Sequence, residues 1–440
     1  MLRDLSILAL IRRFSMDVLI VGGGGREHAL TWKLNQSDQV DQLYCAPGNA
    51  GIGQLAERLK IPSSNTRQLA DAAESNNIDL TVVGPEAPLA AGIVDVFEER
   101  DLAIFGPNKE AAKAEASKVF TRELSREQGV PSPGYKVFEN ASDALSHLET
   151  RTFPTVVKAD GLAAGKGAFV CDTYDEAEEA VNTIMVDRKF GEAGDQIVVE
   201  ECLEGQEASI LAICSGTDLV VLAPSQDHKQ IYEGDEGPNT GGMGAYCPTP
   251  FVDEQVREQV IENMFLPTLH GLQKKGIEYK GVLYAGLMLT QNGPRLLEYN
   301  VRFGDPEAQP ILQRMDVDLF PYLLEAANGT LDNVDPVEWK SKHSLCVIAA
   351  SEGYPIDYDT GYKITGVDDV GPSDEAVVFH AGTDVRDGEL VTDGGRVLGV
   401  SALGDTLESA QERAYDELEK IDFRGMTYRT DIGHHGLDYS

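Results

Sequence analysis

Residues 156–167 combine an apolar strand with a glycine-rich loop and two lysines, reading VVKADGLAAGKG. A triphosphate site needs backbone N–H groups that can approach the anion closely and ammonium groups that neutralise its charge. The glycines Gly161, Gly165 and Gly167 and the lysines Lys158 and Lys166 meet these two needs. The spacing is not that of a Walker loop. For this segment alone, the alternative is an ordinary turn with two solvated lysines.

A second segment, RLLEYNV at residues 295–301, has the alternation of a β-strand. Alternation puts Glu298 and Asn300 on one face, and such a pair of oxygen ligands can hold Mg²⁺, which prefers hard oxygen donors. The other face would carry Leu297, Tyr299 and Val301. The alternative interpretation is a polar outer face without a ligand.

Three loops are rich in charged residues, hydrogen-bond donors or glycine. They read RFGDPE (302–307), SQDHK (225–229) and GPNTGGMGAY (237–246). Each loop alone is compatible with an ordinary turn, but together they are too many to be turns only. The strand VVEECLEGQE (198–207) adds Glu200, Glu201 and Glu207, which are either solvated edge groups or hydrogen-bond partners.

These groups together are typical of ATP-dependent activation of a carboxylate. Lysines and backbone amides would hold the triphosphate, Mg²⁺ on Glu298 and Asn300 would bridge its oxygens, and Arg302 would neutralise the transferred phosphoryl group. An amine would then attack the acyl phosphate. Water must be excluded from such an intermediate, and the segment 161–167 is the predicted lid.

The elements that position these residues begin with an α/β pattern. Apolar runs at 17–21, 79–83 and 103–107 alternate with helical segments up to about residue 110, which predicts a small open α/β sheet. A glycine turn follows the first run, but Arg26 stands where a dinucleotide-binding fingerprint needs its last glycine. A dinucleotide site is therefore not expected.

The carboxy-terminal part forms a last unit that starts near residue 341, after an acidic linker. It ends in a helix expected at 406–420, with Asp405 and Glu408 as the predicted capping box. The apolar face of this helix carries Leu407, Ala410, Ala414 and Leu418. Two further helices are expected at 110–128 and 174–188.

The motifs, taken in order, resemble the phosphoribosylamine–glycine ligase family, also called glycinamide ribonucleotide synthetases, of the ATP-grasp superfamily. The resemblance covers residues 16 to about 435. It is carried by GGREHAL (24–30), APGNAG (46–51), VGPEAPL (83–89), KADGLAAGKG (158–167), SQDHK, GPNTGGMGAY, YAGLM (284–288), EYNVRFGDPEAQP (298–310) and FHAGT (379–383).

The resemblance implies three domains of an α/β fold. These are an amino-terminal open α/β domain (16–117), a two-lobed ATP-grasp domain (118–335, with a lid lobe at about 130–205) and a small carboxy-terminal α/β domain (336–440). Residues 1–15 have no counterpart, so this extension is expected to be disordered or untranslated, with Met16 as the start.

The resemblance also implies a role for individual residues. Lys118 and Lys158 would contact the phosphates of ATP, and Gly161, Gly165, Lys166 and Gly167 would close over them. The backbone of Glu200, Glu201 and Leu203 would read adenine, Glu207 would bind the ribose, and Glu298 and Asn300 would bind Mg²⁺ or Mn²⁺. Arg302, Gly304, Asp305, Glu307, Asp227 and Lys229 would line the glycine and acyl-phosphate region. Gly25, Arg26, Glu27 and Asn49 would face the ribose phosphate of 5-phosphoribosylamine. The expected catalytic groups are Arg302, Lys158, Asp227 and Lys229.

The implied reaction joins glycine to 5-phosphoribosylamine with conversion of ATP to ADP and phosphate, in de novo purine biosynthesis. One alternative is another ATP-grasp ligase that joins a different amine or carboxylate. A second is a nucleotide-binding module without catalysis, which predicts lost charges at the phosphate and metal positions. Lys158, Glu298, Asn300 and Arg302 are all present.

The charge balance restricts the partners of the chain. With 73 acidic and 37 basic residues its net charge is −36, which argues against binding to nucleic acid or to anionic membranes. No apolar run approaches the ~20 residues of a bilayer span, and no signal peptide is expected. The chain is expected to be a cytoplasmic monomer or weak homo-oligomer. The six cysteines contain no C-x-x-C pair, so reduced, buried thiols are expected in place of a metal site.

The dispersed acidic residues also predict a halophilic protein. At ~1 M salt the Debye length falls to ~3 Å, which limits the repulsion between surface carboxylates. Lowering KCl from molar to millimolar concentration is therefore expected to lower the melting temperature. Thermal unfolding followed by circular dichroism at both concentrations measures this, and an unchanged melting temperature would contradict the expectation.

Overall fold

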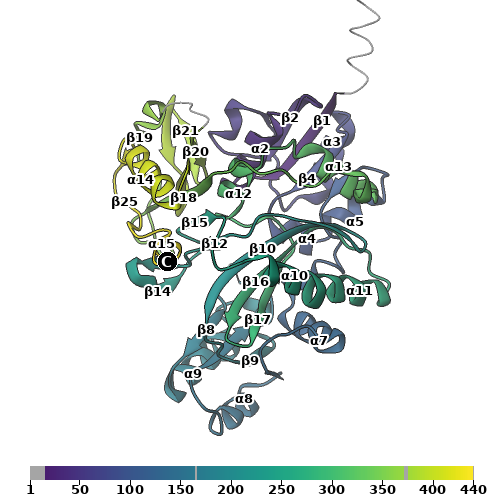
Figure 1. The fold of residues 1–440 in the computed structure, drawn as a ribbon, viewed down its shortest axis with the longest axis vertical. Coiled ribbons are helices and arrows are strands. Elements are labelled where there is room, and N and C mark those ends of the chain that lie inside the picture. The colour runs from purple at the N-terminus through teal and green to yellow at the C-terminus, as the bar shows by residue number, and fades with distance from the viewer. Residues whose placement is uncertain (1–14, 164–165, 371–374, 440) are drawn as a thin grey trace, which may run out of the picture.

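The structure is a computed structural model that describes residues 15–163, 166–370 and 375–439 (Figure 1). The expectation about residues 1–15 therefore lies, except for Ser15, outside the described residues. Figure 1 shows an amino-terminal unit at the top, a lid lobe at the bottom and a carboxy-terminal unit at the upper left, arranged around a central sheet.

The amino-terminal unit is a five-stranded parallel sheet in the order β3-β2-β1-β4-β5. Its strands are β1 (Met16–Gly22), β2 (Val40–Pro47), β3 (Glu57–Arg58), β4 (Leu80–Val83) and β5 (Ile104–Phe105). The helices that connect them are α2 (Gly25–Leu34), α3 (Thr66–Ser75), α4 (Glu86–Ala90) and α5 (Ile93–Glu98). The chain reverses its winding at β1, which lies between β2 and β4. Ligands bind at the carboxyl ends of strands beside such a reversal, and the loops after β1 and β4 are there.

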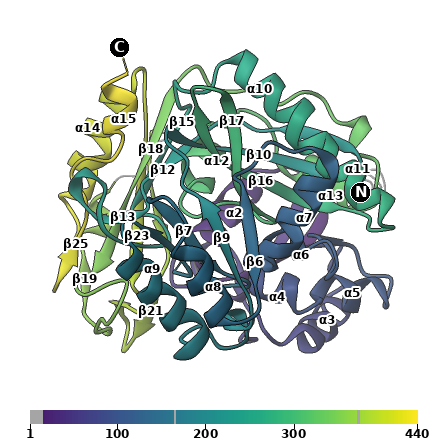
Figure 2. The same ribbon diagram turned by 90° about the horizontal axis from the view of Figure 1, so that it is seen from below.

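The lid lobe is a four-stranded antiparallel sheet in the order β6-β9-β7-β8. It consists of β6 (Tyr135–Phe138), α8 (Ala141–Leu148), β7 (Thr155–Ala159), β8 (Ala168–Cys171), α9 (Tyr174–Val181) and β9 (Ile197–Glu201). These elements share a hydrophobic core of their own. The helix expected at 174–188 is present over 174–186, because α9 runs to Val181 and the chain continues as a π-helix, Asn182–Val186. Seen from below, the lobe lies in front of the other units (Figure 2).

The central sheet has the order β11-β10-β16-β17. It consists of β10 (Gln206–Ser215), β11 (Asp218–Val221), β16 (Lys280–Thr290) and β17 (Gly293–Asn300). The helices packed around it are α7 (Lys118–Gln128), α10 (Glu254–Val260), the π-helix Ile261–Phe265, α11 (Leu266–Lys274) and α13 (Phe320–Asn328). Two hydrophobic clusters each combine residues of this sheet with residues of the amino-terminal sheet, so the two units share their core.

The helix expected at 110–128 is broken at Ser117. A short helix, α6 (Lys113–Ala116), ends there, and α7 begins at Lys118. Ser117 has an extended backbone, and its side chain accepts a hydrogen bond from the N–H of Phe120. Serine is a preferred N-cap because its hydroxyl satisfies a free N–H of the first turn. The expectation of one continuous helix overlooked this cap.

The carboxy-terminal unit is a six-stranded sheet whose main path is β12-β15-β18-β23-β20, with β25 paired to β18. The strands are β12 (Gln226–Asp227), β15 (Gly244–Cys247), β18 (His343–Ser351), β20 (Ala376–His380), β23 (Arg396–Gly404) and β25 (Met426–Thr427). Strands β12 and β15 come from the SQDHK and GPNTGGMGAY segments. These two segments are therefore not free loops, because pairing of β15 with β18 fixes them to the last unit of the chain.

Helix α14 (Leu407–Leu418) covers this sheet and buries Leu407, Ala410, Ala414 and Leu418, as predicted. The predicted capping box is wrong by one residue. Thr406 is the N-cap, and it exchanges hydrogen bonds with Ser409. Helix α12 (Ala308–Arg314) packs between α2 and this sheet.

The remaining short elements are β13 (Gln230–Tyr232) with β14 (Glu236–Asn239), β19 (Ile364–Thr365) with β24 (Asp422–Phe423), β21 (Thr383–Arg386) with β22 (Glu389–Thr392), and α15 (His434–Leu437). All six cysteines are free thiols; five are buried and Cys202 is partly exposed. Within the described ranges, no helix has both the length and the apolar composition that crossing a membrane requires.

Candidate active site

Lys158 and Glu200 are the centre of a buried polar network between the lid lobe and the central sheet. Nζ of Lys158 lies 2.9 Å from the Glu200 carboxylate and donates to the carbonyl of Leu297 at 3.3 Å. Arg122 of α7 donates to the same carboxylate through Nε and Nη2, the latter at 3.0 Å. The network therefore joins β7 and β9 of the lid lobe to α7 and β17.

The network decides between the two interpretations of the acidic strand. Glu200 is only 1% exposed and is a buried hydrogen-bond partner, whereas Glu201 is exposed and accepts one hydrogen bond, from the N–H of Gly134 at 3.1 Å. Burial acts to raise the pKa of Glu200, but Lys158 and Arg122 outweigh it and lower this pKa to about 2. Sequence reasoning missed Arg122, because it is one of several charged residues on an amphipathic helix and differs from them only in being buried.

Replacing Glu200 by Gln is expected to lower the free energy of unfolding by about 3–5 kcal/mol, because two buried cations lose their counter-charge. The folded-state pKa lies below the ordinary 4.5, so the stability from this carboxylate is fully present above about pH 4.5 and is lost as the pH falls toward 2. Denaturant unfolding of wild type and E200Q should therefore differ at pH 7 and differ less in acid. E201Q, on the exposed neighbour, should change stability by less than ~0.5 kcal/mol. Equal stability of E200Q and wild type at pH 7 would contradict this account.

Glu298 is a carboxylate surrounded by cations that do not touch it. Burial acts to raise its pKa, but Lys158, Lys118, Lys229 and Arg302 outweigh this effect and lower it. Among the described residues, none forms an ion pair or hydrogen bond with the Glu298 carboxylate or with the Lys118 ammonium group. Both side chains are partly buried, and burial lowers the pKa of Lys118. Partly buried charges without protein partners are typical of a site that a polar ligand completes.

A β-bulge sets the direction of Glu298. The register of β17 against β16 shifts between Leu296 and Glu298, which leaves Leu297 without a cross-strand partner. The predicted alternation is therefore wrong at Leu297, because Leu296 is fully buried and Leu297 only partly. Tyr299 and Val301 are buried as predicted.

The donor set on β17 fits a hard divalent cation. Asn300 shares the strand face of Glu298, because the two residues are separated by one position. Oδ1 of Asn300 accepts a hydrogen bond from Nη2 of Arg302 at 3.3 Å. Arginine can only donate, so this contact assigns the amide oxygen to that position. A free carboxylate beside an oriented amide oxygen suits Mg²⁺ or Mn²⁺.

Arg302 is held by two carboxylates from earlier segments of the chain. Its guanidinium lies 3.1 Å from Glu115 and 3.4 Å from Glu86. Burial acts to lower the pKa of Arg302, but Glu115 and Glu86 outweigh it and hold this pKa above its ordinary value. Neither glutamate was a predicted site residue. Glu86 lies within the VGPEAPL motif, which was the available signal, whereas Glu115 had none.

Lys229 lies between two carboxylates, those of Glu207 and Asp227. Nζ of Lys229 forms an ion pair with the Glu207 carboxylate and lies 3.9 Å from Oδ1 of Asp227. Burial raises the pKa of Asp227 to about 7, and the nearby carboxylates of Glu307 and Glu207 act in the same direction. Glu207, which is expected to bind a ribose, is thus tied to the lysine of the SQDHK motif.

The RFGDPE loop is fastened by Tyr284 and Arg396. The hydroxyl of Tyr284 donates to the carboxylate of Glu307. Arg396 on β23 donates to the Asp305 carbonyl at 2.6 Å, to the Asp305 carboxylate at 2.8 Å and to the Gly241 carbonyl at 2.6 Å. One arginine of the carboxy-terminal unit therefore joins two loops of the site. Sequence reasoning missed it, because the surrounding run GGRVLGV carries no other chemistry.

Replacing Arg396 by Lys is expected to lower kcat/KM by about 10²-fold, because an ammonium group cannot hold three acceptors in one plane and small displacements of reacting groups are costly. A positioning role predicts that the KM for glycine rises and that the fold is retained. Steady-state kinetics with circular dichroism measures both. R386K is the matched control, since Arg386 lies in the same unit in an exposed pair with Asp393. Unchanged kinetics of R396K would reject the role.

The amino-terminal loop meets the RFGDPE loop directly. Arg26 donates to Glu27 at 2.6 Å and to the Phe303 carbonyl at 3.1 Å. Glu27 accepts from the N–H of Gly24 at 2.6 Å. Asn49 is buried, and its amide donates to the His380 carbonyl at 2.7 Å. These predicted substrate residues are therefore engaged within the protein, and they hold the loop at the crevice of the parallel sheet.

Two predicted glycines lie directly against polar side chains of the site. A Cβ on Gly25 would lie 2.7 Å from Nε2 of Gln309. A Cβ on Gly304 would lie 2.4 Å from the Glu307 carboxylate. At both positions a side chain would displace a polar group of the site.

Three family models match successive parts of the chain. They are described as the N domain (residues 16–115), the ATP-grasp (A) domain (116–308) and the C domain (344–435) of phosphoribosylglycinamide synthetase. The chain belongs to the phosphoribosylglycinamide synthetase family. It is 49% identical over 417 residues to a phosphoribosylamine–glycine ligase of Caldanaerobacter subterraneus, covering 95% of this chain and 99% of the relative. It is 47% identical over 427 residues to one of Rhodopirellula baltica, covering 96% and 98%.

Solved structures agree with this membership. A phosphoribosylamine–glycine ligase from Thermotoga maritima superposes with a TM-score of 0.83 at 34% identity, covering 94% of this chain and 100% of that one. The biotin carboxylase domain of a Hydrogenobacter thermophilus 2-oxoglutarate carboxylase, in complex with MgADP, has a TM-score of 0.73 at 14% identity, with coverage of 94% and 91%. The second likeness concerns the fold alone.

Membership in the phosphoribosylglycinamide synthetase family confirms the resemblance, the α/β fold class with an ATP-grasp domain and the expected ligase function. The roles of single residues and the domain boundaries stay predictions. Gly165 lies outside the described residues. Lys166 donates to the Pro355 carbonyl at 2.8 Å, so the predicted lid touches the carboxy-terminal unit.

Proposed function

We propose that this chain joins glycine to 5-phosphoribosylamine, with conversion of ATP to ADP and phosphate, and releases glycinamide ribonucleotide for purine biosynthesis. The observation that supports it most is a pair of partly buried charges, Lys118 and Glu298, at the junction of the lid lobe and the central sheet, neither of which has a bonded partner among the described residues. A bound triphosphate would pair with the Lys118 ammonium group, and the divalent cation that accompanies it would pair with the Glu298 carboxylate.

We infer the following placement of ATP. Lys118 and Lys158 would contact the phosphates, and residues 161–167 would cover them. The N–H of Leu203 has no hydrogen-bond partner within the described ranges, so it is free to donate to adenine at the end of β9. Mg²⁺ or Mn²⁺, held by Glu298 and Asn300, would supply positive charge to the phosphate oxygens.

The acyl-transfer region would lie between the RFGDPE loop and Asp227. Arg302, held in place by Glu86 and Glu115, would face the phosphoryl group as it moves from ATP to the glycine carboxylate. Lys229 would neutralise the carboxylate of the bound glycine before the phosphoryl group is transferred to it. The amine of 5-phosphoribosylamine would then attack the acyl carbon and displace phosphate. Its ribose phosphate would lie near the amino-terminal loop, with Gly25 and Arg26.

Detection of the product tests the proposal. Freshly made 5-phosphoribosylamine, glycine and ATP–Mg²⁺ are incubated with the chain in high salt, and glycinamide ribonucleotide is measured by mass spectrometry. Product that depends on all three substrates, with one ADP per product, is expected. ADP release with other amines or carboxylates, without this product, would favour a different ATP-grasp ligase.

A further inference from the structure

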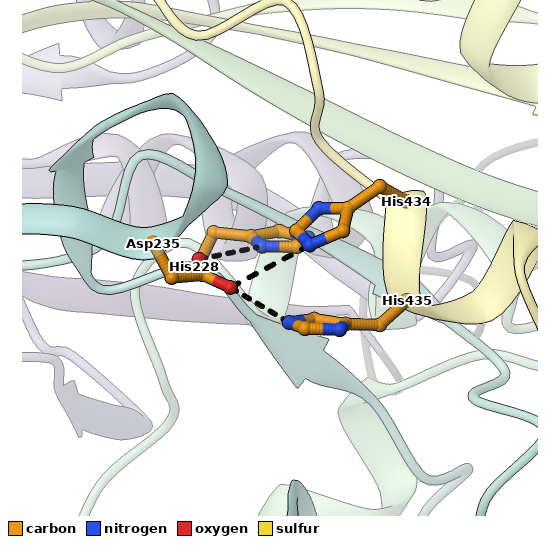
Figure 3. Close-up of side chains that lie close together, drawn as sticks. All are labelled: His228, Asp235, His434 and His435. Carbon is orange, nitrogen blue, oxygen red and sulfur yellow. Dashed lines mark hydrogen bonds and ion pairs between the residues drawn. The ribbon is translucent and has the colours of Figure 1, made fainter.

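Three histidines and an aspartate converge beside the site, on its carboxy-terminal side (Figure 3). His228 lies between Asp227 and Lys229 in the SQDHK motif, and Asp235 ends the short turn Glu233–Asp235. His434 and His435 begin α15, far away in the sequence. Their four ligand atoms lie within 4.8 Å of one another. None of these four residues has a role in the proposed ligation.

A backbone hydrogen bond fixes the orientation of His434. Its Nδ1 lies 2.9 Å from the carbonyl of Asp431. A carbonyl can only accept, so Nδ1 carries a proton, and the other ring nitrogen, Nε2, is directed toward Asp235. Nε2 of His434 lies 3.5 Å from Oδ2 of Asp235, and Nε2 of His435 lies 2.7 Å from the same oxygen. Histidines that bind metals are commonly oriented by such an N–H to carbonyl bond.

His228 is oriented the other way and supports the aspartate. The N–H of Gly433 donates to its Nε2 at 2.9 Å, so Nδ1 carries the proton. Within the described ranges, this buried Nδ1 has no partner closer than Oδ1 of Asp235, at 3.6 Å. Arg429 donates to the same Oδ1 at 2.9 Å. Arg429 therefore holds one oxygen of Asp235, with the His228 ring beside it, and the other oxygen faces the two histidines of α15.

We propose that Oδ2 of Asp235 and the Nε2 atoms of His434 and His435 bind a divalent transition-metal ion such as Zn²⁺. Tetrahedral Zn²⁺ with ligands at ~2.0–2.1 Å places its ligand atoms ~3.3 Å apart. The separations of 2.7 and 3.5 Å lie on either side of that value. Both Nε2 atoms converge on this one carboxylate oxygen, and a metal ion would take the place of a proton between each nitrogen and the carboxylate.

The surroundings suit an ion that enters from solvent. The side chains of His434, His435 and Asp235 are 27%, 32% and 27% exposed, which leaves a position for water as a further ligand. Asp431 and Asp235 carry two negative charges against one on Arg429. Imidazole nitrogens favour Zn²⁺, Ni²⁺ or Co²⁺ over Mg²⁺, so this site would differ in metal from the oxygen ligands on β17.

The ion would connect the end of the chain to the active site. Asp235 contacts His228, and His228 is flanked by Asp227 and Lys229. Binding would therefore brace the SQDHK segment against α15. The binding itself does not depend on the proposed ligation and is measurable without substrates.

Zinc retention by the full chain tests the site. Chelator-treated protein receives Zn²⁺ in the presence of excess Mg²⁺, passes through gel filtration, and is measured by elemental analysis and calorimetry. We expect about one zinc per chain, a higher melting temperature with zinc, and at least ~10-fold lower retention by the double variant H434N/H435N. H270N, at an exposed histidine of α11, should match wild type.

E298Q separates this site from the oxygen ligands on β17, and it should retain zinc like wild type. Circular dichroism of the double variant shows whether it is folded, which is expected because both histidines are partly exposed. Absence of retained zinc in wild type would overturn the proposal. Equal retention by the folded double variant would overturn it as well, because the ion would then be bound elsewhere.

Discussion

Replacing Lys158 by Met should lower the turnover number by about 10²- to 10³-fold, because the charge that develops on the transferred phosphoryl group loses a preorganised counter-charge. The fold should be retained. Lys158 shares the Glu200 carboxylate with Arg122, so this carboxylate keeps a cation after the substitution. The loss should appear in kcat at saturating ATP, since the ammonium group acts on the transition state more than on bound ATP.

Product formation and ADP release at saturating substrates measure this effect, with a thermal melt to confirm folding. K136M is the matched control, because Lys136 lies in the same lobe, on β6, with its side chain exposed. It should have wild-type kinetics. A folded K158M enzyme with the wild-type turnover number would reject the catalytic role of this lysine.

Replacing Glu298 by Gln should lower kcat/KM by at least ~10²-fold. Glu298 is the carboxylate common to Lys118, Lys158, Lys229 and Arg302, and its pKa is lowered by them, so it is ionised at neutral pH. An amide of the same shape removes that charge and is a weaker ligand for a hard cation. The concentration of Mg²⁺ needed for half-maximal rate should therefore rise.

Initial rates over a range of Mg²⁺ concentrations test this prediction. E258Q, on the exposed face of α10, is the matched control and should follow the wild-type curve. The change at Glu298 should also lower the melting temperature, because the nearby cations lose a carboxylate whose pKa they lower, so a thermal melt is used to confirm that the variant is folded. An unchanged Mg²⁺ dependence would reject the metal role, and an unchanged kcat/KM would reject the site.

Local sequence patterns were enough to predict most of the helices and strands, and most of the charged residues that lie in the candidate site. The buried run at 17–21 became β1, and the alternation of 295–301 brought Glu298 and Asn300 to one face. The errors were local too. Ser117 is a cap that divides the helix expected at 110–128, and Thr406 is an N-cap one residue after the expected Asp405. A bulge in β17, which depends on the pairing with β16, reversed the expected burial of Leu296 and Leu297.

The partners of the site residues were much harder to predict. Arg122, Glu115 and Arg396 contact site residues that lie far away in the sequence, at Glu200, Arg302 and Asp305. Nothing in their local sequence separates them from surface charges. Their burial and their acceptors follow from the packing of three units against one another, and this packing is a property of the whole chain.

The order of the motifs along the chain was enough to establish the family, the α/β class and the groups that bear charge, since each motif depends on side-chain chemistry and on local backbone freedom. The tertiary structure alone decided which charges are neutralised within the protein and which remain without partners. Glu200 is paired with Lys158 and Arg122, whereas Glu298 and Lys118 have no bonded partner in the part of the chain that the structure describes. The physical reason is that an ion pair depends on distance and burial, and both are set by contacts between residues that the sequence keeps far apart.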